Sequence, residues 1–346
     1  MGNTSEFYSA ANGLKSFDQI LTEAANEQPD RVAFRLLEFD ASENEQITYE
    51  QLRHQVDFVS SVLYSKFDVG DVAVLFYPTS IEFAIALLGC LASGVVAVPV
   101  NPPRDLTPVE RDHWIANIVK DSNAKAILTT EILARIMSER FSGVYTFDPG
   151  NQIPTTGPSN FAPVADSQAI IDYALNSDGK REATRISHGD LVAKMQWMKA
   201  RYRHGNQSMF VSCLPTSGGA GMQGNLLQAI YAKCSAVFMS PFMADRSAIR
   251  WLEAASDFNA TTISAPYEVF ESCIESELTL ETKLQLDSVA NAYADPGLIG
   301  TDVADKFVRR FASCGLTAEA IKPMPVMGKG IVSHAHGTFN DSLINS

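Results

Sequence analysis

Apolar and polar residues follow two different periods along the chain, one typical of helices and one typical of buried strands. Ser16–Gln28 gathers its apolar residues on one helical face. Thr48 and Gln51 have the spacing of a capping box, which predicts that a second helix begins there. Ser80–Ser93 is predicted as an apolar helix. The strands predicted around these helices are Arg31–Leu37, Asp71–Tyr77, Val95–Val100 and Ala124–Leu128.

The second half of the chain repeats the alternation. Its predicted strands are Ser208–Leu214, Ser235–Ser240 and Ala260–Ser264. The predicted helices between them are Leu226–Ala232 and Ala248–Phe258. Strands that alternate with helices indicate parallel sheets with helices on both faces. The sequence therefore predicts the α/β class, as two similar layered α/β subdomains with largely parallel sheets.

A stretch rich in Pro, Gly, Ser, Thr and Asn separates the two halves, between Pro149 and Gln168. We place the subdomain boundary there. The predicted organisation is an N-terminal α/β subdomain at 1–150, a linker or long loop at 151–168, a second α/β subdomain at 169–332 and a tail at 333–346.

The stretch from Tyr173 to Leu191 carries the clearest chemical signal. A short apolar run precedes it and a helical pattern begins near His188, so a strand, a polar loop and a helix follow one another. This is the arrangement in which backbone N–H groups bind phosphate. The loop has one glycine, Gly179, and two acids, Asp178 and Glu182, which would repel a polyphosphate. These residues alone favour an ordinary polar surface loop over an anion site.

Composition and charge narrow the class of partner. Apolar residues make up 46% of the chain, and the net charge is −13 with no basic cluster to offset it, which argues against nucleic acid and against an anionic membrane surface. No apolar run has the length of a membrane span and no secretory signal opens the chain, so we predict a cytoplasmic protein. The five cysteines are scattered and are predicted to be reduced thiols. No metal site is predicted, because His334 and His336 have no Cys or acid cluster beside them.

The 173–191 stretch resembles the phosphate-loop motif of the adenylate-forming enzymes, above all that of the fatty acyl-AMP ligase branch. That motif reads Y-T-S-G-S-T-G-x-P-K-G and continues to S/T-H-G-N-L. The residues that match it are Tyr173, Ser177, Gly179, Ser187, His188, Gly189 and Leu191. Asp178 replaces a Thr, and Glu182 stands where the family has its phosphate-binding Lys. The resemblance thus implies a degenerate phosphate loop made of Tyr173, Ser177, Gly179, Lys180 and Glu182.

The resemblance covers roughly Phe17 to Val332. In the second half, Gly218 and Gly219 take the place of a His-Asp pair of the family, and Asp295 falls on its adenine-contacting A-E-P segment. The residues that the resemblance assigns to the cleft or acyl pocket are Gly218, Gly219, Met222, Met239, Ser264 and Tyr267. The family continues with a mobile C-terminal lid domain that carries a catalytic lysine, and we expect that domain to be absent here.

The departures bear on activity, because adenylation needs magnesium and cations to neutralise charge at the α-phosphate. Loss of one such group typically costs a factor of about 10² to 10³ in rate. We therefore expect that ATP with magnesium is not a cofactor and that this chain alone does not adenylate. The favoured interpretation is a binding or scaffold module for an acyl chain or acyl-carrier protein in fatty-acid, polyketide or peptide biosynthesis. A ligase partner, or self-association through an exposed sheet edge, is compatible with it.

Two alternatives remain open. The first is a repurposed enzyme that uses the vacated cleft without ATP, with Ser177, Cys213 or Ser217 as nucleophile and His188 as base. No Ser/His/Asp spacing supports this directly, since a histidine at that place is more often a helix-start residue. The second is one part of a split acyl-AMP ligase that a second polypeptide completes.

Overall fold

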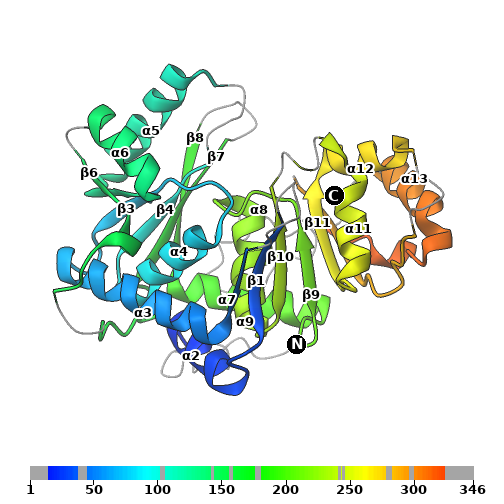
Figure 1. The fold of residues 1–346 in the computed structure, drawn as a ribbon, viewed down its shortest axis with the longest axis horizontal. Coiled ribbons are helices and arrows are strands. Elements are labelled where there is room, and N and C mark those ends of the chain that lie inside the picture. The colour runs from blue at the N-terminus through cyan, green and yellow to red at the C-terminus, as the bar shows by residue number, and fades with distance from the viewer. Residues whose placement is uncertain are drawn as a thin grey trace, which may run out of the picture.

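A computed structural model gives the fold. It describes residues 15–37, 45–101, 106–141, 144–155, 159–175, 181–240, 243, 246–277, 283–295 and 300–323. Within these ranges two six-stranded sheets lie side by side, and helices separate and cover them (Figure 1).

The sheet that contains the N-terminal strand has the order β12-β11-β9-β10-β1-β2. Its strands are β1 (Val32–Leu37), β2 (Glu45–Thr48), β9 (Met209–Ser212), β10 (Ser235–Met239), β11 (Thr262–Pro266) and β12 (Asn291–Asp295). Neighbouring strands are parallel except for the antiparallel pair β1 and β2. We call it the β9 sheet.

The other sheet has the order β6-β5-β3-β4-β7-β8. Its strands are β3 (Val72–Leu75), β4 (Val96–Pro99), β5 (Ala126–Leu128), β6 (Tyr145–Phe147), β7 (Gln168–Leu175) and β8 (Arg181–Ser187). Neighbours are again parallel except for the antiparallel pair β7 and β8. We call it the β7 sheet. The two sheets confirm the predicted α/β class with largely parallel strands.

Each sheet takes strands from both sides of the 151–168 segment. Strands β1 and β2 come from the first part of the chain but complete the β9 sheet, whereas β7 and β8 follow the segment and complete the β7 sheet. The sheets therefore do not divide where the composition changes. The division of the chain into folding units at 151–168 stays a prediction.

Helices form three layers around the sheets. Those between the sheets are α2 (Phe17–Glu27), α3 (Tyr49–Lys66), α4 (Ile81–Ser93), α7 (His188–Tyr202) and α9 (Gln228–Ala232), which share one hydrophobic cluster with both sheets. The outer face of the β7 sheet is covered by α5 (Pro108–Ser122) and α6 (Glu131–Arg140). The outer face of the β9 sheet is covered by α11 (Ile249–Asp257), α12 (Tyr267–Glu275) and α13 (Thr301–Phe311).

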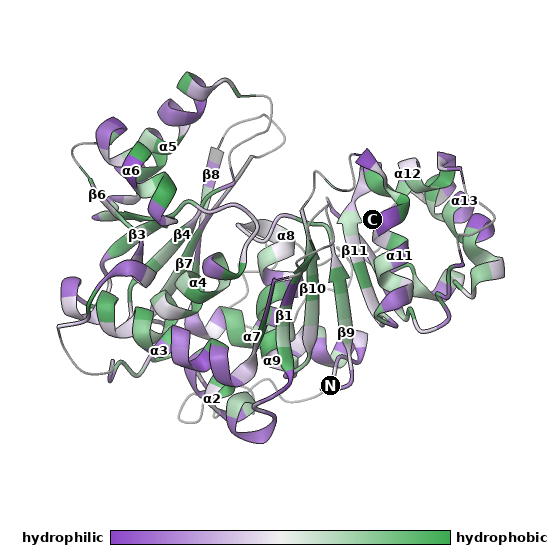
Figure 2. Ribbon diagram, viewed as in Figure 1, coloured by the Kyte–Doolittle hydropathy of each residue, from purple (hydrophilic) through white to green (hydrophobic). Residues whose placement is uncertain are grey.

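The local sequence signals explain where these elements begin. The helix predicted at Ser16–Gln28 is α2, and both α2 and α3 begin with complete capping boxes, at Ser16 and Thr48. The buried residues of both helices belong to the cluster that the sheets share, and Figure 2 shows hydrophilic and hydrophobic residues along each helix. The predicted polar loop before His188 is wrong in part, because residues 181–187 form strand β8, which pairs with β7 from Gln168 to Leu175. No helix in the part of the chain described here is both long and apolar enough to cross a membrane.

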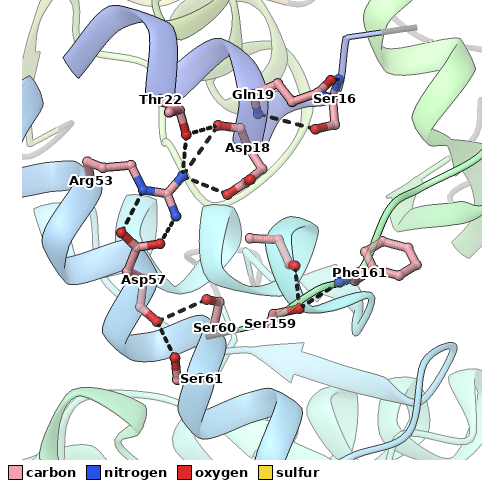
Figure 3. Close-up of polar contacts among 11 residues, drawn as sticks. Ser16, Asp18, Gln19, Thr22, Arg53, Asp57, Ser60, Ser61, Ser159 and Phe161 are labelled. Atoms are coloured by element: carbon pink, nitrogen blue, oxygen red, sulfur yellow. Dashed lines mark hydrogen bonds and ion pairs between the residues drawn. The ribbon is translucent and has the colours of Figure 1, made fainter. Parts of the chain in front are cut away.

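Arg53 joins the polar faces of α2 and α3 (Figure 3). Its Nη1 donates to Asp18 Oδ1 at 2.6 Å and to Thr22 Oγ1 at 3.2 Å, while its Nε donates to Asp57 Oδ2 at 2.9 Å. The guanidinium therefore bridges acids on two helices, a geometry that suits its planar array of donors. The two helices are fixed together above the core that both sheets share.

Candidate functional site

The candidate site lies where β7 of one sheet meets the turn that follows β9 of the other. In open α/β sheets, ligands bind beyond the carboxyl ends of the parallel strands. Here the chain leaves β9 at Ser212 and reaches Gly218 and Gly219 next to Asp172 of β7. The N–H of Gly219 donates to the Asp172 carboxylate. This contact brings the two sheets together at the edge where a ligand would be expected.

The turn depends on its glycines. Gly219 has a φ of +52°, in the left-handed region that favours glycine, and a Cβ there would meet no heavy atom within 4 Å. A Cβ at Gly221 would lie 2.0 Å from the carbonyl oxygen of Pro215, so only glycine fits there. Helix α8 (Gly219–Gly221) then continues into a π-helical segment, Met222–Leu227. Such segments occur frequently at functional sites.

A chain of polar groups runs inward from this turn, from the half-buried Asp172 to two buried side chains. Asp172 accepts from Gln223 Nε2 at 3.2 Å, and Gln223 Oε1 accepts from Lys194 Nζ at 2.6 Å. Lys194 lies on α7 and Gln223 on the π-helical segment, so three elements contribute one residue each. Lys194 is 3% exposed and Gln223 is 1% exposed. One amide thus links a buried lysine amine to a half-buried carboxyl group.

Burial shifts the proton affinity of both charged ends. Desolvation lowers the pKa of Lys194 to about 7, although the charge of Asp172 opposes the shift. Desolvation likewise raises the pKa of Asp172, against the opposing effects of Lys194, Gly219 and Gln223.

A second carboxylate, at the end of β12, faces the same edge. Burial raises the pKa of Asp295, and the neighbouring charges of Glu268 and Asp172 raise it further. These three carboxylates make the edge electronegative.

The predicted phosphate loop falls largely outside the described residues, which end at 175 and resume at 181. Ser177, Gly179 and Lys180 lie in that interval. Tyr173 is described, and its hydroxyl donates to Asp121 Oδ2 on α5 at 2.6 Å. Successive residues of a strand point to opposite faces, so Tyr173 faces the outer helices while Asp172 faces Gly219. Glu182 is half-buried on β8, opposite Ala174.

His188 does not have the surroundings of a general base. It is 2% exposed, and its ring lies 5.9 Å from that of Phe161. Its Nδ1 has no hydrogen-bond partner among the described residues, while its backbone N–H donates to Ser167 O at 2.9 Å at the start of α7. Burial lowers the pKa of His188 to about 4. The residue packs as a neutral ring at the start of a helix.

The other predicted nucleophiles are buried after β9. Cys213 is fully buried, and both its backbone N–H and its Sγ face Ser264 O, at 3.1 and 3.8 Å. Ser217 is 4% exposed. Ser264 Oγ donates to Asn225 Oδ1 and shares a hydrogen bond with Ser212 Oγ, each at 2.9 Å. Ser264 is therefore part of a buried hydroxyl–amide group that ties β11 to β9 and to the π-helical segment.

The residues assigned to an acyl pocket divide between two cores. Met222 is fully buried in the cluster between the sheets, whereas Met239 belongs to the cluster under α11, α12 and α13. Tyr267 begins α12 and packs against that second cluster. Only Gly218 and Gly219, of the six, lie beside Asp172.

The sequence interpretation missed Asp172, Lys194 and Gln223. A signal for Lys194 was present, because it falls on the apolar stripe of its helix, three residues after Leu191 and four before Met198, and both of these are fully buried. Asp172 likewise interrupts an apolar run. Within the described ranges no three His, Cys, Asp or Glu side chains are placed to hold a metal ion. His334 and His336 lie outside those ranges.

Comparison with known proteins gives matches that extend over most of the chain. The sequence profile described as "AMP-binding enzyme" matches residues 21–320. JamA, a medium-chain-fatty-acid–[acyl-carrier-protein] ligase of Moorena producens, is 25% identical over 86% of this chain and 52% of its own length. TtuA of Teredinibacter turnerae, which carries the same enzyme name, is 22% identical over 91% of this chain and 56% of its own.

Solved structures agree in fold. A fatty acyl-adenylate ligase from L. pneumophila, in complex with acyl adenylate and pyrophosphate, has a TM-score of 0.77 at 21% identity over 90% of this chain and 55% of that one. A fatty acid AMP ligase from Legionella pneumophila has a TM-score of 0.79 at 22% identity, over 90% and 54%. The chain thus spans about half the length of the relatives that it matches.

Proposed function

Because the chain belongs to the AMP-binding enzyme family, on its fatty acyl-AMP ligase branch, we propose that it binds an acyl chain or an acyl-carrier protein and does not itself carry out ATP-dependent adenylation. The observation that carries the proposal is the charge at the edge of the sheets.

An adenylating site must stabilise negative charge that develops on a phosphate. At this edge the neighbouring charges of Glu268 and Asp172 raise the pKa of Asp295, so acidic groups gather at the edge that a polyphosphate would approach. Lys194 donates to Gln223 from a buried position, so its amine is not directed at a ligand on the surface. The described residues at this edge therefore do not fit ATP with magnesium, and no reaction step is assigned to that cofactor.

The acyl-binding part of the proposal rests on the family to which the chain belongs and on the hydrophobic core between the two sheets. The core between the sheets is mainly apolar, and a Cβ on Gly219 of the turn would meet no heavy atom within 4 Å. The enzyme names of JamA and TtuA specify fatty acids and acyl-carrier protein as their substrates. A carrier-protein partner for this chain is proposed on that basis.

Calorimetric titration of the purified chain tests both halves of the proposal. Magnesium-ATP is titrated first, and a long-chain acyl-AMP analogue second, with AMP alone as the control for the nucleotide part. We expect no heat with ATP and saturable binding of the acyl ligand. Clear ATP binding would overturn the loss of adenylation, and silence with the acyl ligand would overturn acyl binding.

Charge variants test the stated cause. If the carboxylates exclude ATP, Glu268→Gln with Asp295→Asn should strengthen ATP binding measurably. Glu319→Gln is the matched control, because it removes an exposed carboxylate from the turn after α13, outside this group of acids. Equal ATP binding by the double variant, the control and the unaltered chain would show that these acids are not the cause.

A further inference from the structure

Strand β6 ends the β7 sheet without the charged side chains that lie on the other sheet edges. The two sheets end at β2, β6, β8 and β12. A glutamate lies on β2, two arginines and a glutamate lie on β8, and an aspartate lies on β12. Strand β6 consists of Tyr145, Thr146 and Phe147. Because charged side chains at an edge oppose pairing with another chain, β6 is the edge best suited to such pairing.

The backbone of Thr146 directs its hydrogen-bonding groups towards the free edge. Phe147 O accepts from Thr129 N at 3.1 Å, on the side where β6 pairs with β5 in parallel register. In a paired strand, the N–H and C=O groups of neighbouring residues point to opposite edges. Those of Thr146 therefore point away from β5, and no strand within the described ranges meets them there. An extended chain that arrived at this edge would find one donor and one acceptor.

Aromatic rings line the face of this edge that lies towards α3. The ring of Phe147 stacks on that of Phe67, just after α3, with centroids 6.1 Å apart, and the ring of Tyr145 stacks on Phe147 at 4.6 Å. Lys66 Nζ lies 5.6 Å from the centroid of the Tyr145 ring. The stack begins in the core and ends at Tyr145, which is 48% exposed. Its last ring therefore has apolar surface left to bury.

Helix α6 adds apolar surface on the opposite face of the sheet. It lies beside β6 (Figure 1), and Met137 is the one buried residue in it. Ile132 and Ile136, one helical turn apart, are 74% and 45% exposed. Every large apolar side chain that is exposed within the described ranges lies between residues 58 and 164, in the part of the chain that precedes β7. Exposed apolar side chains that gather in one region mark an interaction surface.

We propose that two copies of this chain pair edge to edge through β6, in antiparallel orientation, about a two-fold axis that passes between their Thr146 residues. The N–H of Thr146 in each copy donates to the C=O of the partner's Thr146. In this register Tyr145 of each copy lies opposite the partner's Phe147, so the aromatic stack continues from one copy into the other. The two β7 sheets then form one continuous sheet. The pairing goes beyond the acyl binding proposed above and does not depend on it.

A second copy fits this edge because the match is reciprocal. A two-fold interface uses the same patch on both copies, so the patch must complement itself. With Thr146 at the axis, an aromatic ring meets an aromatic ring on one face, and a threonine meets a threonine on the other. The axis is perpendicular to the sheet, so the two α6 helices lie on the same face. Their exposed isoleucines, Ile132 and Ile136, add apolar area that a strand of three residues lacks.

The net charge of the chain predicts how salt affects the dimer. Each copy carries a net charge of −13, whereas the residues of β6 are uncharged. Salt screens the repulsion between the two copies, so the dimer should become tighter as the salt concentration rises. A partner that charge pairs held at this surface would show the opposite dependence.

The first test is a cross-link at the two-fold axis. Thr146→Cys places two thiols opposite each other, at a hydrogen-bonded position where the Cα atoms of an antiparallel pair are about 5.5 Å apart. That distance lies within the range of about 4.4–6.8 Å that a disulfide spans. Ala183→Cys is the matched control, because Ala183 is exposed on β8, the other edge strand of the same sheet. After mild oxidation, mass spectrometry without reduction should find a dimer joined through position 146 and none joined through position 183.

The second test measures the mass of the chain by sedimentation velocity, from micromolar concentration upwards. We expect a dimer whose share rises with protein concentration and with salt. Tyr145→Lys should raise the dissociation constant at least about 10-fold, because both copies lose an aromatic pair and gain a cation at the interface. Val164→Lys is the matched control, because Val164 is 68% exposed but lies in the segment before β7, away from the β6 edge.

Three results would overturn the proposal. One is a monomer mass at every concentration, and another is equal cross-linking through positions 146 and 183. The third is a dimer that Tyr145→Lys leaves as tight as the Val164→Lys control leaves it. Circular dichroism spectra show whether each variant folds, and the cross-link decides the question if Tyr145→Lys does not fold.

Discussion

Replacement of Lys194 by methionine should abolish a rise in stability with pH that the unaltered chain shows. Methionine keeps an unbranched side chain of similar length and has no proton to bind. In the folded chain the pKa of Lys194 is about 7, below its unfolded value of 10.5. The unfolded state therefore binds more protons than the folded state between these two pH values. Since stability rises with pH wherever the unfolded state binds more protons, the free energy of unfolding should increase through this interval.

The size of the effect follows from the two pKa values. Between pH 7 and pH 8.5 the linkage relation gives a rise of about 1.5 kcal/mol from this one amine. The interval ends there because burial raises the pKa of the Cys234 and Cys273 thiols to about 12, so those groups oppose folding once unfolded thiols begin to ionise. The small residual contribution of buried histidines is the same in both proteins and cancels in the comparison.

Urea unfolding at both pH values measures the difference. We expect the urea midpoint of the unaltered chain to rise from pH 7 to pH 8.5. The free energy of unfolding of Lys194→Met should rise by about 1.5 kcal/mol less over the same interval, at an unchanged m-value. An equal rise in the two proteins would mean that Lys194 has an ordinary pKa in the folded state. The reasoning about its burial would then be wrong.

Three further predictions concern other parts of the fold. His188→Gln should reduce the loss of stability between pH 6.5 and about 4 by up to about 3 kcal/mol, because the pKa of His188 is about 4 in the folded chain and 6.5 in the unfolded chain. Acid unfolding curves of the two proteins, followed by circular dichroism, would contradict this if they coincide. Gly315→Ala and Gly70→Ala both place alanine at a φ near +90°, which costs about 1–2 kcal/mol. Only the Cβ at 315 would also lie 2.8 Å from Asp287, so thermal melts should show the larger loss of stability for Gly315→Ala, and equal losses would refute the clash. Tyr49→Phe should lower the free energy of unfolding by about 1–3 kcal/mol, because the Tyr49 hydroxyl donates to Cys234 O at 2.7 Å in the core. Tyr64→Phe is the control: it removes an exposed hydrogen bond to Asn160 and should change stability by less than about 0.5 kcal/mol in the same urea titrations.

The parts of the fold that local signals specify were predictable. Helices α2 and α3 each begin with a capping box. Its two residues, Ser16 with Gln19 in α2 and Thr48 with Gln51 in α3, are three positions apart in the sequence. Strand β8 was missed because its polar residues occur on both faces of an edge strand, so the alternation that marks a half-buried strand is absent.

The centre of the candidate site could not be read from local pattern. Gly218 and Gly219 were found through the family resemblance, but the carboxylate that they contact lies on the other sheet. Lys194 and Gln223 are 29 residues apart, and Gln223 and Asp172 are 51 apart. No helical or strand period connects such positions. Only the meeting of β7, α7 and the π-helical segment brings them within hydrogen-bonding distance.

The exchange of strands between the two halves has a consequence for how the chain reaches its native state. Arg31, just before β1, donates to Ser235 of β10 across a separation of 204 residues. A ribosome must therefore synthesise most of the protein before its first strand has a parallel partner, and such long-range pairing slows folding. Until then β1 lacks the parallel partner that covers its edge in the native sheet, and an unpaired strand edge invites association with other chains. Expression of the first 150 residues alone would deprive β1 of its partner β10 altogether.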